Sequence, residues 1–190
     1  YFSKYFIYYS TMRILFFTPT YNNINTCNAV IKSIRKTYDN EILIFDDGSE
    51  PRFRLKQKLK NITIKRNFKN AGKGNVILQG FKYAKENDYS HIITIDSDMQ
   101  HDPVYLKDFI DAPVKYDIVY GRRYFNKDMP YSRIISNWIT SKIISYISKC
   151  KIYDSQCGFR RYNISFIENI DLIEKESHIY PIKLNFKTTN

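Results

Sequence analysis

Two carboxylates, Asp96 and Asp98, directly follow the short apolar segment HIITI at residues 91–95. If the chain stays extended there, side chains two residues apart point to the same side. Two carboxylates on one side, completed by the phosphate oxygens of a ligand, are a usual protein arrangement for Mg²⁺. Gln100 continues the same alternation and would add a further oxygen. A turn or a helix cap, where Asp is also common, is the alternative interpretation.

Three other polar segments could contact a nucleotide. Asp47 stands in DDGS, which either ends a strand in a turn or offers a carboxylate to a nucleobase or ribose. Lys73 stands in NFKNAGKGN, a glycine-rich helix start that either approaches a nucleotide or is only a flexible entry. Arg123 follows DIVYG, where it is either surface charge or a group that stabilises a leaving diphosphate.

Apolar segments alternate with amphipathic ones, which predicts strands alternating with helices. The predicted strands cover residues 13–18, 41–45, 62–65, 91–95 and 117–120, and the predicted helices cover 24–36 and 73–87, with a short helix after Pro103. This order predicts an α/β fold, a mostly parallel sheet with helices on both faces. Because ligands bind beyond the carboxyl ends of such strands, we expect one crevice bordered by Tyr21, Asp47, Asp96, Asp98 and Arg123.

A further helical stripe runs from Ser132 to Lys149. Its apolar positions recur at helical spacing: Ile135, Trp138, Ile139, Ile143, Tyr146 and Ile147. Such a stripe usually faces the core of a protein. Its aromatic and basic character leaves contact with a membrane surface as the alternative.

Composition narrows the class of protein. The 190 residues carry a net charge of +11, and residues 51–85 contain Lys and Arg but no Asp or Glu. That run is either a solvated surface or a contact for an anionic partner, namely nucleic acid, acidic lipid or a phosphorylated substrate. Three cysteines without a CxxC pair indicate neither a disulfide framework nor a zinc site, which favours a reducing, cytoplasmic compartment. No apolar stretch approaches the roughly 20 residues that cross a bilayer, so we expect a soluble or peripheral protein.

Six segments in order resemble the family-2 glycosyltransferases with a GT-A fold, a Rossmann-like α/β architecture. The nearest group resembles the dolichyl- or polyprenyl-phosphate sugar synthases. The matching segments are TPTYNN (18–23), EILIFDDGS (41–49), NAGKGNVILQGFKYA (70–84), IITIDSDMQHDP (92–103), DIVYGRRY (117–124) and DSQCGFRRY (154–162). The resemblance implies an inverting transferase that uses a nucleoside-diphosphate sugar with Mg²⁺ or Mn²⁺.

The same resemblance assigns residues to the site. It implies a nucleotide-sugar site made by Pro19, Tyr21, Asn23, the Phe45 backbone, Asp47, Lys73, Asp96, Ser97, Asp98 and Arg123. Many relatives have a Glu at the position of Asn23. It implies Asp96, Asp98 and Gln100 as metal ligands, and Asp98 and Arg123 as the catalytic residues. It implies an acceptor side formed by Gln156, Gly158 and Arg160.

The chemical class of the acceptor can be argued from the need for a catalytic base. We see no obvious catalytic base near the acceptor segment, and the oxygen of a lipid phosphate is already ionised, whereas a hydroxyl needs a base. We therefore expect polyprenyl phosphate as the acceptor, with a surface glycan as the rival. An inactive relative that only binds nucleotide sugar, and a nucleic-acid-binding module, are the other hypotheses. We expect that the protein does not bind nucleic acid. We expect it to contact the cytoplasmic face of a membrane as a peripheral protein.

The expected organisation has three parts. Residues 1–11 precede Met12, where the sequence MRILFFTPTYN begins with the first predicted strand, and we interpret them as an accessory or upstream segment. Residues 12–165 form the nucleotide-sugar-binding catalytic domain. Residues 166–190 are a shortened C-terminal segment, because EKESHIYPIKLNF follows CGFRRYN sooner than in relatives.

Overall fold

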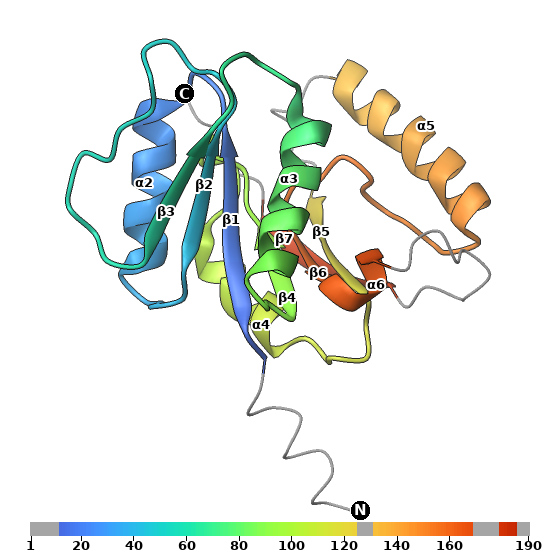
Figure 1. The fold of residues 1–190 in the computed structure, drawn as a ribbon. Coiled ribbons are helices and arrows are strands. Elements are labelled where there is room, and N and C mark those ends of the chain that lie inside the picture. Colours follow the sequence, from blue (N-terminus) through green and yellow to red (C-terminus); the bar gives the residue numbers. More distant parts are fainter. Residues whose placement is uncertain (1–11, 125–130, 169–178, 186–190) are drawn as a thin grey trace, which may run out of the picture.

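The computed structural model describes residues 12–124, 131–168 and 179–185. Its centre is a seven-stranded sheet in the order β3-β2-β1-β4-β6-β5-β7 (Figure 1). The strands are β1 (Ile14–Thr20), β2 (Ile42–Asp46), β3 (Ile62–Arg66), β4 (His91–Thr94), β5 (Ile118–Tyr124), β6 (Arg160–Asn163) and β7 (Ile179–Asn185). The predicted strands and the predicted mostly parallel sheet are confirmed.

Strand β6 is the one antiparallel member among the strands described. It lies between β4 and β5 and runs against both. The pairs β3–β2, β2–β1, β1–β4 and β5–β7 are parallel. Because β6 carries the end of the segment DSQCGFRRY, its insertion brings residues 154–160 to the carboxyl end of β4.

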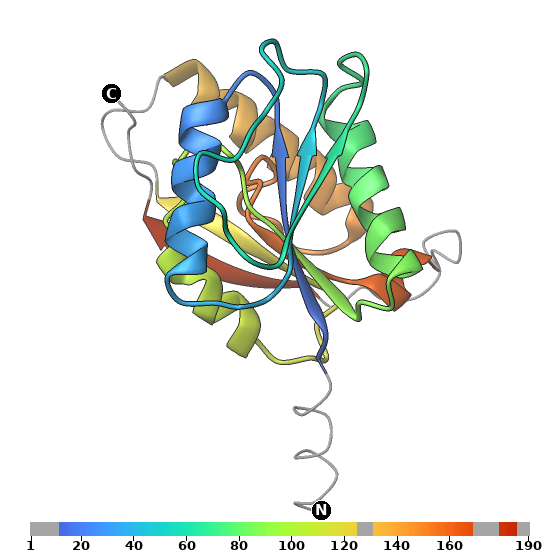
Figure 2. The same cartoon turned by 60° about the vertical axis from the view of Figure 1, so that its left-hand side comes forward.

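Helices cover both faces of the sheet, as predicted (Figure 2). They are α2 (Ile24–Arg35), α3 (Lys73–Glu86), a 3₁₀ turn (Pro103–Tyr105), α4 (Leu106–Asp111), α5 (Tyr131–Ser148) and α6 (Ile164–Glu168). One core cluster joins α2 and α4 to side chains such as Phe16 and Ile44, and the other joins α3 to Leu15, Phe17 and Leu43. The two clusters use alternate residues of the same strands, as the two-residue repeat of a strand requires.

Helix α3 comes very close to the sheet. A Cβ on Gly80 would lie 2.7 Å from the ring of Phe17, so a larger residue there would push the helix outward. This close approach holds the first turn of α3, with Lys73, over the carboxyl ends of the central strands.

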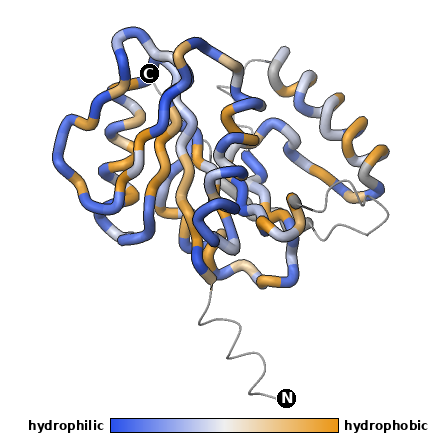
Figure 3. The backbone as a smooth tube through the Cα atoms, viewed as in Figure 1, coloured by the Kyte–Doolittle hydropathy of each residue, from blue (hydrophilic) through white to orange (hydrophobic). Residues whose placement is uncertain are grey.

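Helix α5 corrects an expectation. Its apolar stripe does not face the core: Ile135, Trp138, Ile139, Ile143, Tyr146 and Ile147 are all exposed. The buried residues of this helix are polar, namely Asn137 and Ser141. Figure 3 shows the apolar residues along α5, which lies beyond the sheet at the side of β5. The interpretation of this stripe as core is therefore wrong, because helical spacing marks one face of a helix but not the direction in which it points.

The predicted three-part organisation remains a prediction. Residues 1–11 lie outside the described residues. Within the expected C-terminal segment, β7 pairs in parallel with β5 from Ile118↔Ile179 to Tyr124↔Asn185. In the part of the chain that is described, no helix combines the length and apolar character needed to cross a bilayer.

Candidate functional site

A pocket of about 350 Å³ lies beyond the carboxyl ends of β1, β2 and β4. Eight of the predicted nucleotide-sugar residues line it: Pro19, Tyr21, Asn23, Asp47, Lys73, Asp96, Ser97 and Asp98. Sequence reasoning missed four further lining residues: Thr20, Asn70, Gly72 and Val76. Their position beside Tyr21 or Lys73 in the chain is the signal that could have identified them. The structure therefore brings together side chains from strand ends that are far apart in sequence.

Asp47 organises one wall of this pocket. Its Oδ1 accepts hydrogen bonds from Asn67 Nδ2 at 2.8 Å and from the Ala71 backbone at 2.9 Å, and its Oδ2 accepts one from Gly72 N at 2.9 Å. The carboxylate thus fixes the loop that leads into α3. Phe45, predicted through its backbone, does not line the pocket, and its side chain is buried in the core.

Lys73 and Asp96 form an ion pair across the pocket. Lys73 Nζ lies 2.6 Å from Asp96 Oδ1, and both residues line the pocket. A cationic group therefore already stands beside one of the two predicted metal ligands.

The local backbone around Asp98 differs from the expected extended chain. Strand β4 ends at Thr94, Ser97 and Asp98 lie in a turn, and Met99 has a φ of 62°. Asp98 Oδ1 accepts a hydrogen bond from the Gln100 backbone at 3.0 Å, which stabilises this turn. The expected alternation through Gln100 is therefore wrong, and Gln100 does not line the pocket. Asp96 and Asp98 share the pocket because the turn places them there.

The donor set suits one divalent cation that is shared with a ligand. In the described residues, no group of at least three His, Cys, Asp or Glu side chains could hold a metal ion. Asp96 and Asp98 both line the pocket and offer hard oxygens. One or two carboxylates completed by substrate phosphates are the usual arrangement for Mg²⁺, so these residues fit such a cation.

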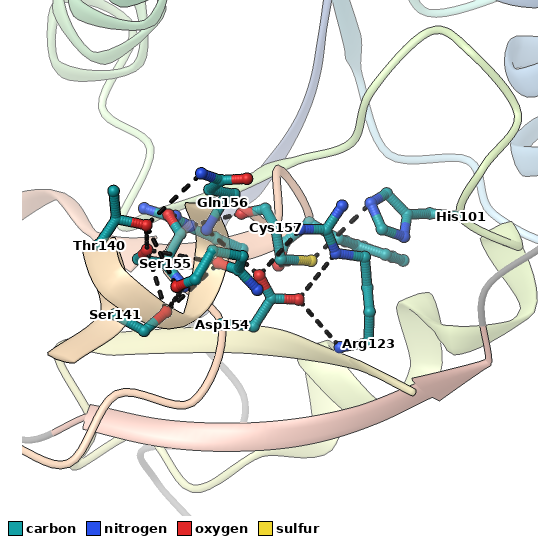
Figure 4. Close-up of polar contacts among 11 residues, drawn as sticks. His101, Arg123, Thr140, Ser141, Asp154, Ser155, Gln156 and Cys157 are labelled. Atoms are coloured by element: carbon teal, nitrogen blue, oxygen red, sulfur yellow. Dashed lines mark hydrogen bonds and ion pairs between the residues drawn. The ribbon is translucent and has the colours of Figure 1, made fainter. Parts of the chain in front are cut away.

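Arg123 lies outside the set of pocket-lining residues and is held by Asp154 (Figure 4). Arg123 Nε lies 2.7 Å from Asp154 Oδ2, and Nη2 lies 2.9 Å from Oδ1. Burial alone would raise the pKa of Asp154, but the hydrogen bonds and charge of Arg123 lower it below its ordinary value. Burial likewise opposes the charge of Arg123, but Asp154 raises the pKa of that guanidinium. Both groups are therefore charged at neutral pH.

The predicted acceptor-side residues have three different environments. A Cβ on Gly158 would lie 2.1 Å from Asp96 Oδ2, so this glycine lies directly against a pocket carboxylate. Arg160 donates hydrogen bonds to the carbonyls of Ser155 at 2.6 Å and Cys157 at 2.7 Å and so shapes the preceding loop. Gln156 is exposed at the surface beside α5.

Two residues near this loop were not singled out from the sequence. Asp154 is the partner of Arg123, and no local pattern distinguishes it from a turn residue. His101 is buried, with its Nε2 at 3.8 Å from Cys157 Sγ. Burial lowers the pKa of His101, which keeps the ring neutral near neutral pH.

Comparison with known proteins agrees with this geometry. The model of the family described as "Glycosyl transferase family 2" matches residues 16–171. An uncharacterised protein of Methanocaldococcus jannaschii is 32% identical over 168 residues, which are 80% of this chain and 72% of that protein. The polyprenol monophosphomannose synthase of Mycolicibacterium smegmatis is 25% identical over 194 residues, which are 95% of this chain and 73% of that one.

A solved structure shares the fold. The glucosyl-3-phosphoglycerate synthase of Mycobacterium tuberculosis, in complex with Mn²⁺, uridine diphosphate and glucosyl-3-phosphoglycerate, superimposes with a TM-score of 0.67 at 13% identity. The alignment covers 95% of this chain and 73% of that chain. The expected GT-A fold is confirmed by this likeness.

Proposed function

This chain belongs to glycosyl transferase family 2 and is a glycosyltransferase, and we propose that it transfers a sugar from a nucleoside-diphosphate sugar to polyprenyl phosphate with the help of Mg²⁺ or Mn²⁺. One observation carries the proposal: Asp96 and Asp98 stand together in a pocket at the carboxyl end of a parallel sheet. Ligands of open α/β sheets bind at this end.

The donor occupies the 350 Å³ pocket in this proposal. Tyr21 and Asn23 contact the nucleoside, and Asp47 keeps the Asn67–Gly72 loop in place beside it. Asp96 and Asp98 would hold the cation, which would supply positive charge against the departing nucleoside diphosphate. Lys73, which pairs with Asp96, would also be able to donate to a phosphate oxygen of the donor.

The choice of a phosphate acceptor is supported by the carboxylates of the pocket, none of which is free to act as a base among the residues that the structure describes. Among its lining residues the titratable carboxylates are Asp47, Asp96 and Asp98. Asp47 is engaged with the loop before α3, and the other two are assigned to the cation. A lipid phosphate brings an oxygen that is already ionised, whereas the hydroxyl of a glycan needs a base within hydrogen-bond reach. The similarity to a polyprenol monophosphomannose synthase supports the same acceptor.

Helix α5 supplies the contact with the membrane in which such an acceptor lies. Its exposed face is apolar, with Trp138 62% exposed, while Asn137 on the opposite face is 1% exposed. A helix in water normally buries its apolar face, so the exposed apolar face supports contact with an apolar surface. Residues 131–151 contain Arg and Lys but no Asp or Glu. An apolar face flanked by positive charge suits the surface of a membrane with anionic lipids.

A thermal-shift series tests the donor site. We expect one of the UDP-, GDP- or dTDP-sugars to raise the melting temperature by several degrees in the presence of Mn²⁺, because a ligand at about 100 times its dissociation constant stabilises the folded state by about 2.7 kcal/mol. Asp98→Ala should lose this shift. Asp108→Ala, which removes an exposed carboxylate on α4, should keep it.

The outcomes separate the hypotheses. A cooperative melt without a shift for any donor would refute the donor site. A shift without transfer of labelled sugar to polyprenyl phosphate would leave a protein that only binds nucleotide sugar. Transfer to a glycan hydroxyl but not to polyprenyl phosphate would refute the proposed acceptor.

Binding to vesicles tests the membrane contact. Trp138 is the only tryptophan of the chain, so its fluorescence reports on α5 directly. We expect a blue shift with vesicles that contain phosphatidylglycerol, and roughly tenfold weaker binding after Ile143→Glu. Leu78→Glu changes an equally apolar, exposed residue on α3 and should bind as the wild type does. Equal losses in the two variants, or no fluorescence change, would contradict the contact.

A further inference from the structure

Asp154 is buried at the centre of a group of polar contacts that the proposed function leaves unused (Figure 4). Its side chain is 0% exposed. It accepts hydrogen bonds from Arg123 Nε at 2.7 Å, from Arg123 Nη2 at 2.9 Å and from the Arg123 backbone at 3.1 Å. The Gln156 backbone donates to it at 3.2 Å. One carboxylate therefore fixes both the end of β5 and the start of the loop at residues 154–158.

The contacts leave one part of the guanidinium unused. Asp154 engages Nε and Nη2 of Arg123, and within the described residues Nη1 has no hydrogen-bond partner. A guanidinium held on two nitrogens has a fixed orientation, and its remaining nitrogen can donate to a phosphate oxygen. A lysine at this position could not do both, because its ammonium is a single point charge on a flexible stem.

The same loop also reaches the pocket. Thr94 donates a hydrogen bond to the Gly158 carbonyl at 2.7 Å, and Gly158 lies against the Asp96 carboxylate. The loop at residues 154–158 therefore connects Arg123 at its first residue with Asp96 at its last. Asp154 therefore contacts both the Arg123 side chain and the loop that lies against the carboxylate proposed to hold the cation.

We propose that Asp154 is a positioning residue, which orients the Arg123 guanidinium so that its free nitrogen meets the diphosphate of the donor. The inference rests on the proposed function, because it requires a nucleoside diphosphate in the pocket. Asp154 itself does not touch the ligand. Its effect should therefore appear only through Arg123 and only on ligands that carry phosphate.

A double-mutant cycle in ligand binding tests this role without requiring turnover. The probes are UDP, GDP and dTDP, each with Mn²⁺, and the phosphate-free nucleosides uridine, guanosine and thymidine, with binding measured by calorimetry. For the nucleoside diphosphate that binds, we expect Arg123→Gln to weaken binding by roughly tenfold, the size of one lost charge-assisted hydrogen bond. Asp154→Asn should weaken it by about three- to tenfold, and the double variant no more than Arg123→Gln alone. Binding of the nucleoside should not change.

A matched pair controls for structural effects. Arg66 and Asp46 form a second ion pair, with a buried carboxylate and a partly exposed guanidinium, at the carboxyl end of β2 and β3. Arg66→Gln and Asp46→Asn should be coupled in thermal unfolding, but they should not reproduce the selective loss of affinity for the diphosphate. Arg123→Lys is a second test in case Asp154→Asn does not fold, because the lysine keeps a positive charge beside the buried Asp154 carboxylate. It should lose as much diphosphate affinity as Arg123→Gln.

Each outcome decides between the two claims. Failure of the wild type to bind UDP, GDP or dTDP would refute the proposed donor site, and the positioning role with it. Binding by the wild type with additive effects of Arg123→Gln and Asp154→Asn would refute the positioning role alone. An equal loss of nucleoside affinity would also refute it, because that result indicates a structural effect. Full affinity in Arg123→Lys would contradict the need for a fixed guanidinium.

Discussion

Helices α2 and α5 meet the rest of the protein with opposite faces. Helix α2 buries Cys27, Val30, Ile31 and Ile34 against the sheet. Helix α5 buries Asn137 and Ser141 and exposes its isoleucines and Trp138. The first helix is held by removal of apolar surface from water, and the second by hydrogen bonds to neighbouring segments.

The hydrogen bonds of α5 serve the loop at residues 154–158. Ser141 Oγ accepts a hydrogen bond from the Ser155 backbone at 2.9 Å, and Ser145 Oγ accepts one from the Ile152 backbone at 2.9 Å. The polar face of α5 thus holds the chain segment that leads to Asp154 and Gly158. In the proposed function, one helix contacts the membrane on its outer face and supports the acceptor side on its inner face.

The largest expected difference is in stability. Ile31→Ala removes a fully buried side chain from the α2 core and should lower the free energy of unfolding by about 3 kcal/mol. Ile139→Ala makes the same change on the exposed face of α5 and should cost less than about 0.5 kcal/mol. Urea denaturation of the two variants in the absence of lipid measures both values. A comparable cost for Ile139→Ala would mean that the apolar face of α5 is buried in solution, which would contradict the difference between α2 and α5.

Sequence and structure agree best where the packing is apolar. The α2 stripe and the strand ends that carry Asp47 and Asp98 could be predicted, because parallel strands bring their carboxyl ends to one edge. The orientation of α5 could not, because a stripe of Ile143 and its neighbours has the same period on either side of a helix.

The polar part of the site was the least predictable. Strand β6 has the sequence RRYN, without an apolar run, so no strand was expected there. Arg123 and Asp154 are 31 residues apart, and no periodicity links them. The predicted extended alternation from Asp96 to Gln100 is wrong because the backbone turns at Asp98 rather than continuing β4.

A second expected effect concerns pH, at the strand where the parallel and antiparallel parts of the sheet meet. Burial, and then the charge of Arg161, lower the pKa of His91 on β4 from its ordinary value of 6.5 to about 4. Below pH 6.5 the unfolded chain therefore binds a proton that the folded protein does not. Stability should fall as the pH is lowered through this range, by roughly 2 kcal/mol between pH 7 and pH 5.

The measurement is urea denaturation at pH 7, 6 and 5. His91→Gln should remove the part of this pH dependence that comes from His91, because Gln does not titrate, and buried His101, whose pKa is also lowered, should account for what remains. The carboxylates with lowered pKa values, such as Asp46 and Asp154, affect stability only at lower pH and so do not interfere. An unchanged slope in His91→Gln would show that another group, such as the buried His101, takes up the proton.

The smallest effect tests how α5 is held. Ser141→Ala removes the hydroxyl that accepts the Ser155 N–H, and an amide left without a partner costs about 1–2 kcal/mol. Ser136→Ala is the control, because the described contact of that hydroxyl is with the exposed Gln156 side chain at 3.3 Å, and this variant should cost less than about 0.5 kcal/mol. Thermal unfolding measures both variants. If Ser141→Ala is as stable as the control, hydrogen bonds do not hold α5, and the contrast with α2 rests on the exposed face alone. If it is less stable and also binds UDP or GDP more weakly, the polar face of α5 supports the loop that begins at Asp154.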